Sequence, residues 1–156
     1  MVSKTIACRL LDTKKIAYTL HEYEWDENNL DAKHVAHLVG MPYEQVFKTL
    51  VLKGDKTGII MTCIPANSQL NMKALASISG NKKVEMVPVK DIQSLTGYIR
   101  GGVSPLGIKK RYPLYVDKSA SAYDTISISA GKRGVQIFLS GTDLIQATEA
   151  KTGDLT

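Results

Sequence analysis

The segment from Phe47 to Ile64 constrains the fold more than any other part of the chain. Residues 47–53 are largely apolar and β-prone, the turn-forming sequence GDKTG follows, and residues 59–64 are again strand-like. Two β-prone runs joined by a short Gly-containing turn are typical of a β-hairpin. We therefore expect an antiparallel pair of strands at the centre of a sheet.

Helical and strand patterns alternate on both sides of this hairpin. One helix is expected to end near Lys14, with Ser3 as its candidate cap, and a second to run from the cap residue Asp31 to Gly40. Further helices are expected at 71–80, 90–95 and 142–150, and further strands at 16–23, 114–116, 125–129 and 135–139. A chain of 156 residues has the size of one domain, here residues 1–156. The interleaved order predicts a mixed-sheet domain of the α/β or α+β class.

Charge and cysteine content favour an intracellular protein. Lysine and arginine number 20 against 15 aspartate and glutamate, which gives a net charge of +5. This excess suits a nucleic-acid partner, but it serves equally well as a solubilising surface charge. Two cysteines, Cys8 and Cys63, are too few for a disulfide framework. Neither a signal-peptide core nor a membrane-length apolar run of roughly 20 residues is seen, so we expect a cytoplasmic protein without a membrane partner.

Lys48 interrupts the apolar run of the first hairpin strand. By alternation it shares a face with Leu50 and Leu52. A lysine on such a face must reach water at a strand end or meet an anion in a cleft, because an unpaired buried charge is costly. Both placements are compatible with the pattern.

Two glycine-bearing segments are candidates for ligand contact. Residues 101–107, GGVSPLG, combine three glycines with a proline, so that backbone N–H groups can approach a carbonyl or phosphate oxygen. Residues 129–134, SAGKRG, lie between two expected strands and combine a hydroxyl group, two cations and flexible backbone. Each segment can equally be an ordinary turn with solvated charges.

Known catalytic and cofactor signatures are missing from the sequence. We find no nucleophile elbow, phosphate-binding loop, dinucleotide fingerprint or Cys-His metal pattern. His34 and His37 are three residues apart on an expected helix, but without a third ligand they indicate exposed histidines rather than a metal pair. We expect neither a metal nor another cofactor.

Five segments together resemble the YbaK/EbsC family of Cys-tRNA(Pro) deacylases. Their order and spacing agree across nearly the whole chain, although each alone is a weak signal. They are Phe47-Lys48-Thr49-Leu50, KKVEM at 82–86, Thr96-Gly97-Tyr98, GGVSPLG at 101–107 and GKRG at 131–134. A more distant resemblance links the chain to the editing domain inserted in bacterial prolyl-tRNA synthetases. The resemblance implies an α+β domain with a mixed, barrel-like β-sheet surrounded by helices, and a cleft for the aminoacyl end of tRNA.

The resemblance also assigns roles to individual residues. Lys48 corresponds to the family's essential lysine, which would hold the phosphate or ribose of the terminal adenosine. Gly101 and Gly102 correspond to the backbone that positions the substrate carbonyl, so these three are the expected catalytic residues. Tyr23 corresponds to a pocket tyrosine, and Ser129 lies on the phosphate-side turn. The full expected substrate-binding set is Tyr23, Lys48, Thr49, Tyr98, Gly101, Gly102, Val103, Ser104, Pro105, Ser129, Gly131, Lys132 and Arg133.

The function implied by the resemblance is trans-editing of mischarged Cys-tRNA(Pro). In the family mechanism the cysteine thiol of the substrate attacks its own ester carbonyl, so the protein needs no nucleophile and contributes positioning and backbone donors. The implied partners are aminoacyl-tRNA, specifically tRNA(Pro), and prolyl-tRNA synthetase.

Two departures from the family pattern leave the substrate open. Ala130-Gly131 stands where many relatives have two glycines, and Lys33-His34 stands where an acidic residue is usual. The alternatives are a deacylase for another small amino acid such as alanine, and a non-catalytic tRNA-binding or regulatory protein of the EbsC type.

Overall fold

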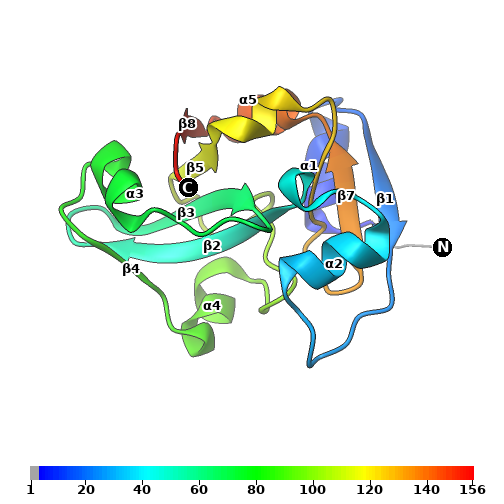
Figure 1. Ribbon diagram of the computed structural model, residues 1–156, viewed down its shortest axis with the longest axis horizontal. Coiled ribbons are helices and arrows are strands. Elements are labelled where there is room, and N and C mark those ends of the chain that lie inside the picture. Colours follow the sequence, from blue (N-terminus) through cyan, green and yellow to red (C-terminus); the bar gives the residue numbers. More distant parts are fainter. Residues whose placement is uncertain (1–3) are drawn as a thin grey trace.

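The computed structural model describes residues 4–156, which form a mixed α+β fold with two β-sheets (Figure 1). The larger sheet has five strands in the order β4-β2-β3-β5-β8. Its strands are β2 (Phe47–Gly54), β3 (Gly58–Pro65), β4 (Val84–Met86), β5 (Leu114–Asp117) and β8 (Lys151–Gly153). Strands β2 and β3 pair in antiparallel register from Phe47 opposite Pro65 to Gly54 opposite Gly58. The hairpin predicted from the sequence is therefore confirmed, and it forms the centre of the sheet.

The smaller sheet is antiparallel and has three strands in the order β1-β7-β6. Its strands are β1 (Tyr18–Glu22), β6 (Ile126–Ser129) and β7 (Val135–Leu139). A single parallel bridge between Val46 and Ser127 connects the two sheets at the start of β2. The expected barrel-like sheet is not found in this form, because β4 and β8 end the larger sheet as open edges instead of pairing with the smaller one.

Local sequence signals explain the five α-helices of the described residues. The helices are α1 (Ile6–Thr13), α2 (Ala32–Val39), α3 (Met72–Ser79), α4 (Val89–Thr96) and α5 (Gly141–Thr148), with short 3-10 helices at Tyr43–Gln45 and Lys118–Ala122. Side chains of Thr5, Asp31, Asn71 and Ser140 cap helix N-termini by accepting backbone N–H groups. Ser3, the predicted cap of α1, lies outside the described residues. None of the helices in residues 4–156 has the length and apolar character needed to cross a bilayer.

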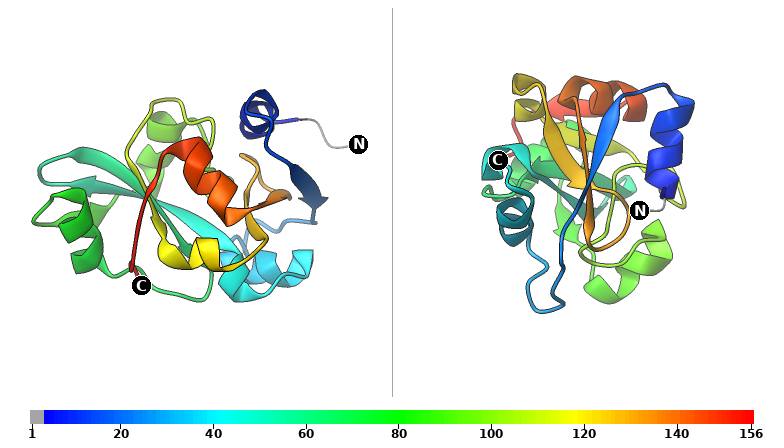
Figure 2. Two further views of the ribbon diagram at one scale, coloured as in Figure 1. Left: turned by 90° about the horizontal axis from the view of Figure 1, so that it is seen from above. Right: turned by 90° about the vertical axis from the view of Figure 1, so that its right-hand side faces the viewer.

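Alternating side chains of the hairpin contribute to two hydrophobic cores. Leu52, Ile60 and Ile64 pack with Leu75 of α3, whereas Phe47, Val51, Met61 and Cys63 belong to the larger core, which also contains the apolar residues of the smaller sheet. Helices α3 and α4 lie on opposite sides of the hairpin (Figures 1 and 2). The hairpin is therefore covered on both sides, as its apolar composition requires.

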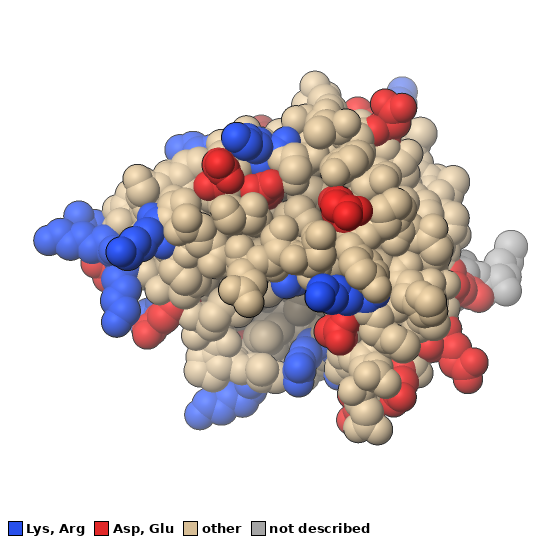
Figure 3. All heavy atoms as spheres, viewed as in Figure 1, with Lys and Arg blue, Asp and Glu red and all other residues tan. Residues whose placement is uncertain are grey.

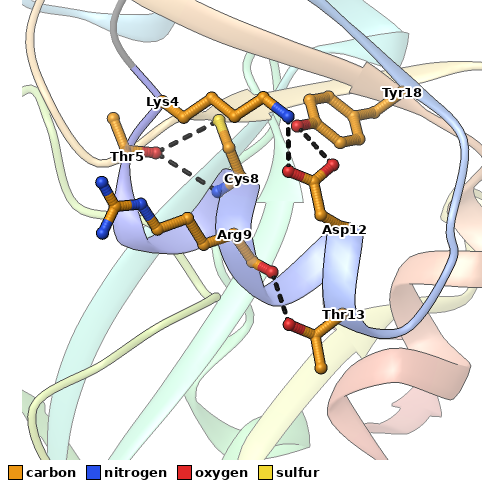
Figure 4. Close-up of polar contacts among 7 residues, drawn as sticks. All are labelled: Lys4, Thr5, Cys8, Arg9, Asp12, Thr13 and Tyr18. Atoms are coloured by element: carbon orange, nitrogen blue, oxygen red, sulfur yellow. Dashed lines mark hydrogen bonds and ion pairs between the residues drawn. The ribbon is translucent and has the colours of Figure 1, made fainter.

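Helix α1 is fastened to its surroundings by polar contacts (Figure 4). The Asp12 carboxylate accepts hydrogen bonds from Lys4 Nζ at 2.7 Å and from the Tyr18 hydroxyl at 2.9 Å. These bonds lower the pKa of Asp12, while burial and the neighbouring carboxylate raise the pKa of Tyr18. The Thr5 hydroxyl donates to the carbonyl of Ala130. Helix α1 thereby supports both β1 and the turn that follows β6.

The buried carboxylate of Asp117 fixes the C-terminal segment. Asp117 Oδ1 accepts the backbone N–H of Leu155 at 2.9 Å, and Oδ2 accepts the Ser119 hydroxyl at 2.6 Å. Leu155 in turn is buried in the α3 core. One side chain at the end of β5 therefore holds together three parts of the chain.

Replacing Asp117 with Ala should lower the free energy of unfolding by about 2–4 kcal/mol, because buried donors of Leu155 and Ser119 lose their acceptor. Urea denaturation followed by circular dichroism measures this change. Asp124→Ala, at an exposed position in the same part of the chain, is the matched control and should change stability by less than about 0.5 kcal/mol. Equal stability of the two variants would contradict the assigned role.

Candidate functional site

A cleft of about 450 Å³ lies where the two sheets meet. Figure 3 shows a hollow in the lower part of the face in view, with both basic and acidic side chains near its rim. The cleft is lined by residues 30–33 and 35 around the start of α2, by Val46 and the first residues of β2 (47–49), by 66–69 after β3, and by Gly101, Val103, Ser129 and Gln136. Parts of the sequence that lie far apart thus contribute to one concave site, which is the usual form of a small-ligand site.

The bridge between the sheets explains why these segments meet. Val46 pairs with Ser127 of β6, and its carbonyl also accepts the N–H of Ala66 at 2.7 Å. The start of β2 is thereby held between the end of β3 and the smaller sheet. Consequently the cleft has walls from both sheets, and the first residues of β2 form its floor.

Lys48 is the cation within this floor. Its Nζ donates a hydrogen bond to the carbonyl of Ala66 at 3.4 Å, which uses one of the three N–H groups of the ammonium. Partial burial and the nearby charge of Lys33 lower the pKa of Lys48, and the Asp31 carboxylate opposes this shift. The lysine predicted to occupy either a strand end or a cleft therefore lies in a cleft, where an anionic or polar ligand would stabilise its charge.

The start of α2 forms the wall next to Lys48. Asp31 caps the helix by accepting the N–H of His34 at 2.8 Å, and Lys33 is exposed in the first turn. Both residues line the cleft. The sequence indicates Asp31 only as a helix cap, because its proximity to Lys48 depends on the fold and not on sequence spacing.

The opposite wall is polar and comes from the smaller sheet. The Ser127 hydroxyl donates to Gln136 Oε1 at 2.8 Å, and Gln136 is only 5% exposed. Because its oxygen is occupied, the amide –NH₂ of Gln136 is the end left to donate to a ligand. Ser129 Oγ accepts the N–H of Gly131 at 3.2 Å and keeps its own O–H as a donor. Gln136 was missed, although a polar residue between Val135 and Ile137 in a buried strand is the same signal that singled out Lys48.

Five of the residues expected at the site line the cleft: Lys48, Thr49, Gly101, Val103 and Ser129. Thr49 contacts Cys63 behind the cleft, with 3.4 Å between Oγ1 and Sγ. Complete burial raises the pKa of Cys63 to about 12. Its thiol is therefore kept neutral.

Other expected residues support the cleft from behind. Tyr98 is buried, and its hydroxyl donates to the carbonyls of Leu106 at 2.6 Å and Gly107 at 3.2 Å. Ser104 is fully buried, and its Oγ accepts the N–H of Leu106. Pro105 lines a separate cavity of about 330 Å³. Tyr98, Ser104 and Pro105 are thus placed to determine the shape of the 97–107 loop rather than to face the cleft.

The two glycines of the loop differ in position. Gly101 has a φ of +85°, and it lines the cleft. Gly102 is buried, and its N–H donates to the carbonyl of Ile99 at 2.9 Å. A Cβ on Gly102 would lie 3.0 Å from the backbone of Lys132, and one on Gly131 would lie 2.9 Å from the Tyr98 ring. Gly102 and Gly131 therefore permit close packing of the loop against the 129–134 turn, and only Gly101 adjoins the cleft.

Tyr23, Lys132 and Arg133 lie outside the cleft lining. The N–H of Tyr23 donates to the carbonyl of Gly134 at 2.9 Å, which continues the contact between β1 and β7. Lys132 is exposed. Arg133 donates from Nε to the carbonyl of Arg100 at 2.8 Å, so it connects the turn to the 97–107 loop.

The chemistry available in the cleft is that of a polar, cationic binding site. Among the described lining residues, Lys33 and Lys48 supply positive charge against the single carboxylate of Asp31, and Thr49, Ser68, Ser129 and Gln136 supply uncharged polar groups. Within residues 4–156, no three His, Cys, Asp or Glu side chains are grouped as metal ligands. The arrangement can hold an anion next to a neutral polar group, as a nucleotide ester presents them.

Comparison with known proteins agrees with this geometry. Residues 26–147 match the aminoacyl-tRNA editing domain family. EbsC of Enterococcus faecalis, a proposed Cys-tRNA(Pro)/Cys-tRNA(Cys) deacylase, is 44% identical over 153 residues, which cover 98% of this chain and 93% of EbsC. A proline–tRNA ligase of Staphylococcus aureus is 24% identical over 106 residues, which make up 68% of this chain and 18% of the ligase.

A solved structure shares the fold. The crystal structure of a proposed trans-editing enzyme for prolyl-tRNA synthetase superposes with a TM-score of 0.83 at 23% identity, covering 99% of both chains. The expected YbaK-like α+β fold is therefore confirmed.

The pKa of Lys48 offers a test of the cleft geometry without any substrate. After reductive ¹³C-methylation of the lysines, the Lys48 resonance should change its chemical shift at a lower pH than an ordinary lysine does, because burial and Lys33 disfavour its charged form. The positive charge is fully present below this lowered pKa and is lost as the pH rises through it. NMR titration measures the midpoint, and Lys48→Arg assigns the signal. A midpoint at or above the ordinary lysine value would contradict the structure of the cleft.

Proposed function

The chain belongs to the aminoacyl-tRNA editing domain family, and from this premise we propose that it is a trans-editing hydrolase. Its reaction is the cleavage of the ester between a mischarged amino acid and the 3′-terminal adenosine of tRNA. The proposed substrate is Cys-tRNA(Pro), and residues 1–156 act as a single editing domain. The observation that carries the proposal is Lys48, a partly buried cation in a polar cleft.

Charge complementarity supports this substrate class. Lys48 would bind the phosphate or ribose of the terminal adenosine, and Lys33 at the start of α2 lies close enough to add a second cation. Ser129 and Gln136 form the facing wall and would donate hydrogen bonds to the neutral part of the ligand. An aminoacyl nucleotide matches these two parts of the cleft, because it joins an anionic phosphate to an ester-linked aminoacyl group.

The backbone at Gly101 is the proposed donor to the ester carbonyl. Gly101 lines the cleft, whereas the N–H of Gly102 is already used by Ile99. Backbone donors that point to the developing oxyanion stabilise the transition state without reorganising. We therefore assign positioning of the carbonyl to Gly101, with Gly102 keeping the loop in place.

The proposed reaction uses the thiol of the substrate as the nucleophile. The cysteine sulfur forms a bond to its own ester carbonyl carbon, the carbon–oxygen bond to the ribose breaks, and the thiol proton ends on the ribose oxygen. The resulting cyclic thioester is then hydrolysed by water. This route fits a cleft whose lining residues include no histidine or cysteine, and it leaves the protein with orientation and charge stabilisation.

The remaining assignments concern the partners. Specificity for tRNA(Pro) requires contacts beyond the terminal adenosine, and we assign these to prolyl-tRNA synthetase acting together with this protein. As a factor of translation fidelity it would act in the cytoplasm.

Lys48→Ala should lower the rate of Cys-tRNA(Pro) deacylation at least about 100-fold, because loss of the cation removes a charged contact to the substrate. Lys53→Ala is the matched control, since Lys53 is an exposed lysine of the same strand, and it should retain the wild-type rate. The assay follows release of labelled cysteine at substoichiometric protein. An unimpaired Lys48→Ala enzyme would exclude the assigned role. Binding without turnover by the wild type would instead support a regulatory tRNA-binding protein.

The thiol-assisted route predicts strict dependence on a free substrate thiol. With the same tRNA(Pro), cysteinyl ester should be cleaved, whereas S-methylcysteinyl, seryl and alanyl esters should react at least about 100-fold more slowly because they lack the nucleophile. Prolyl-tRNA serves as the correctly charged control. Cleavage of the alanyl or S-methylcysteinyl ester at a comparable rate would show that water attacks directly and that the cleft serves another small amino acid.

A further inference from the structure

An exposed tryptophan lies next to the cleft and has no part in the proposed chemistry. Trp25 follows β1 and is 47% exposed. The guanidinium carbon of Arg133 lies 5.3 Å from its ring centroid, a cation–π contact. The exposed part of the ring, with a cation beside it, is available to stack with a ligand.

The ring of Trp25 is held in a defined place. A Cβ on Gly134 would lie 2.9 Å from Trp25 Cδ1, so the backbone of Gly134 packs directly against the ring edge. Arg133 is itself fixed by its hydrogen bond to the carbonyl of Arg100. The tryptophan is thus a preorganised surface, which reduces the entropy cost of binding to it.

Contacts connect this surface to the mouth of the cleft. A Cβ on Gly101 would lie 3.4 Å from Arg133 Nε and 3.1 Å from Leu30 Cδ2. Gly101 and Leu30 both line the cleft, so the guanidinium lies between the cleft rim and the indole ring. A ligand that extends out of the cleft past Gly101 therefore meets Arg133 first and Trp25 next.

The charges around Trp25 restrict the kind of ligand. Glu24, Asp26 and Glu27 are exposed in the same loop and disfavour a phosphate over the ring itself. Arg100 and Lys132 are exposed, and Arg133 donates to the carbonyl of Arg100, so these cations are close to one another and suit a phosphate. An aromatic ring with a cation on one flank is the arrangement on which nucleobases of single strands stack.

We propose that Trp25, supported by Arg133, is a stacking site for the nucleobase that precedes the terminal adenosine of the tRNA. The inference rests on the proposed function for the identity of the RNA, because the unpaired 3′ end of tRNA is the strand that would leave the cleft at this point. The site binds a base of single-stranded RNA and contributes to affinity, while the ester chemistry stays in the cleft.

The experiment uses the fact that Trp25 is the one tryptophan of the 156-residue sequence. The tetranucleotide 5′-ACCA-3′, without an attached amino acid, should quench the fluorescence of Trp25 in a saturable way. Adenosine 5′-monophosphate can fill only the cleft, so it should not quench this fluorescence. A tetranucleotide lacking the base of the penultimate nucleotide keeps the phosphates and should bind about tenfold more weakly, since stacking is worth about 1–3 kcal/mol per base.

Variants are measured by anisotropy of a fluorescein-labelled tetranucleotide. Trp25→Ala should weaken binding about tenfold and should bind the complete and the abasic strand equally, while Trp25→Phe should keep most of the affinity. Met86→Ala is the control, because Met86 is a 49% exposed side chain of β4 that lies outside the cleft lining. This variant should bind as the wild type does.

The outcomes separate this inference from the proposed function. Equal affinity of wild-type protein for the complete and abasic strands, or no quenching by the tetranucleotide, overturns the stacking site even if the protein hydrolyses aminoacyl-tRNA. Stacking in the absence of ester hydrolysis supports the site and refutes the enzyme. For an active enzyme, Trp25→Ala should raise the KM for Cys-tRNA(Pro) about tenfold with kcat unchanged.

Discussion

The structure depends on the junction between its two sheets, at the start of β2. Val46 pairs with Ser127 of the smaller sheet, and its carbonyl accepts the N–H of Ala66 at the end of β3. Strands β2 and β3 are fully paired, so this attachment and the hydrophobic core that both sheets share fix the larger sheet relative to the smaller one. Residues of both sheets line the cleft next to this junction. The larger sheet ends in β4 and β8 and does not close into one barrel with the smaller sheet.

Polar groups concentrate at the junction at a cost to stability. Lys48 is partly desolvated, and the Ser127–Gln136 pair is buried between the neighbouring strands β6 and β7. Buried polar groups need partners, and here the hydrogen bond satisfies one end of Gln136 while the other end remains for a ligand. Residues that break the local hydrophobic pattern without full compensation are expected where a protein binds something. The thiol of Cys63, in contrast, is not available to a ligand. Its burial keeps a reactive group out of a site that would bind cysteine esters.

Local sequence patterns predicted most of the helices and strands. They did not predict the features that depend on which residues become neighbours in the folded chain. The alternation and the GDKTG turn were sufficient for the hairpin, and the caps Asp31 and Asn71 with the terminal glycines were sufficient for two helices. The number of sheets was not predictable, because closure depends on edge pairing of β4 and β8, which are only three residues each. Likewise residues 67–69 join Lys48 in the cleft lining only through the fold, so no sequence spacing indicates them, whereas Gln136 does interrupt the apolar pattern of its strand.

The segments that carry the family resemblance contain residues with two different physical roles. The resemblance alone does not distinguish these roles. Lys48, Thr49 and Gly101 face the cleft, whereas Tyr98, Ser104 and Gly102 are buried behind it and form internal hydrogen bonds. A backbone donor is useful only if its loop is rigid. Two features make this loop rigid: the Tyr98 hydroxyl donates to two loop carbonyls, and Gly102 packs against the backbone of Lys132. The same packing positions Arg133 at the cleft rim. The loop and the turn therefore form one packed unit, which lines the cleft at Gly101 and contacts Trp25 through Arg133 and Gly134.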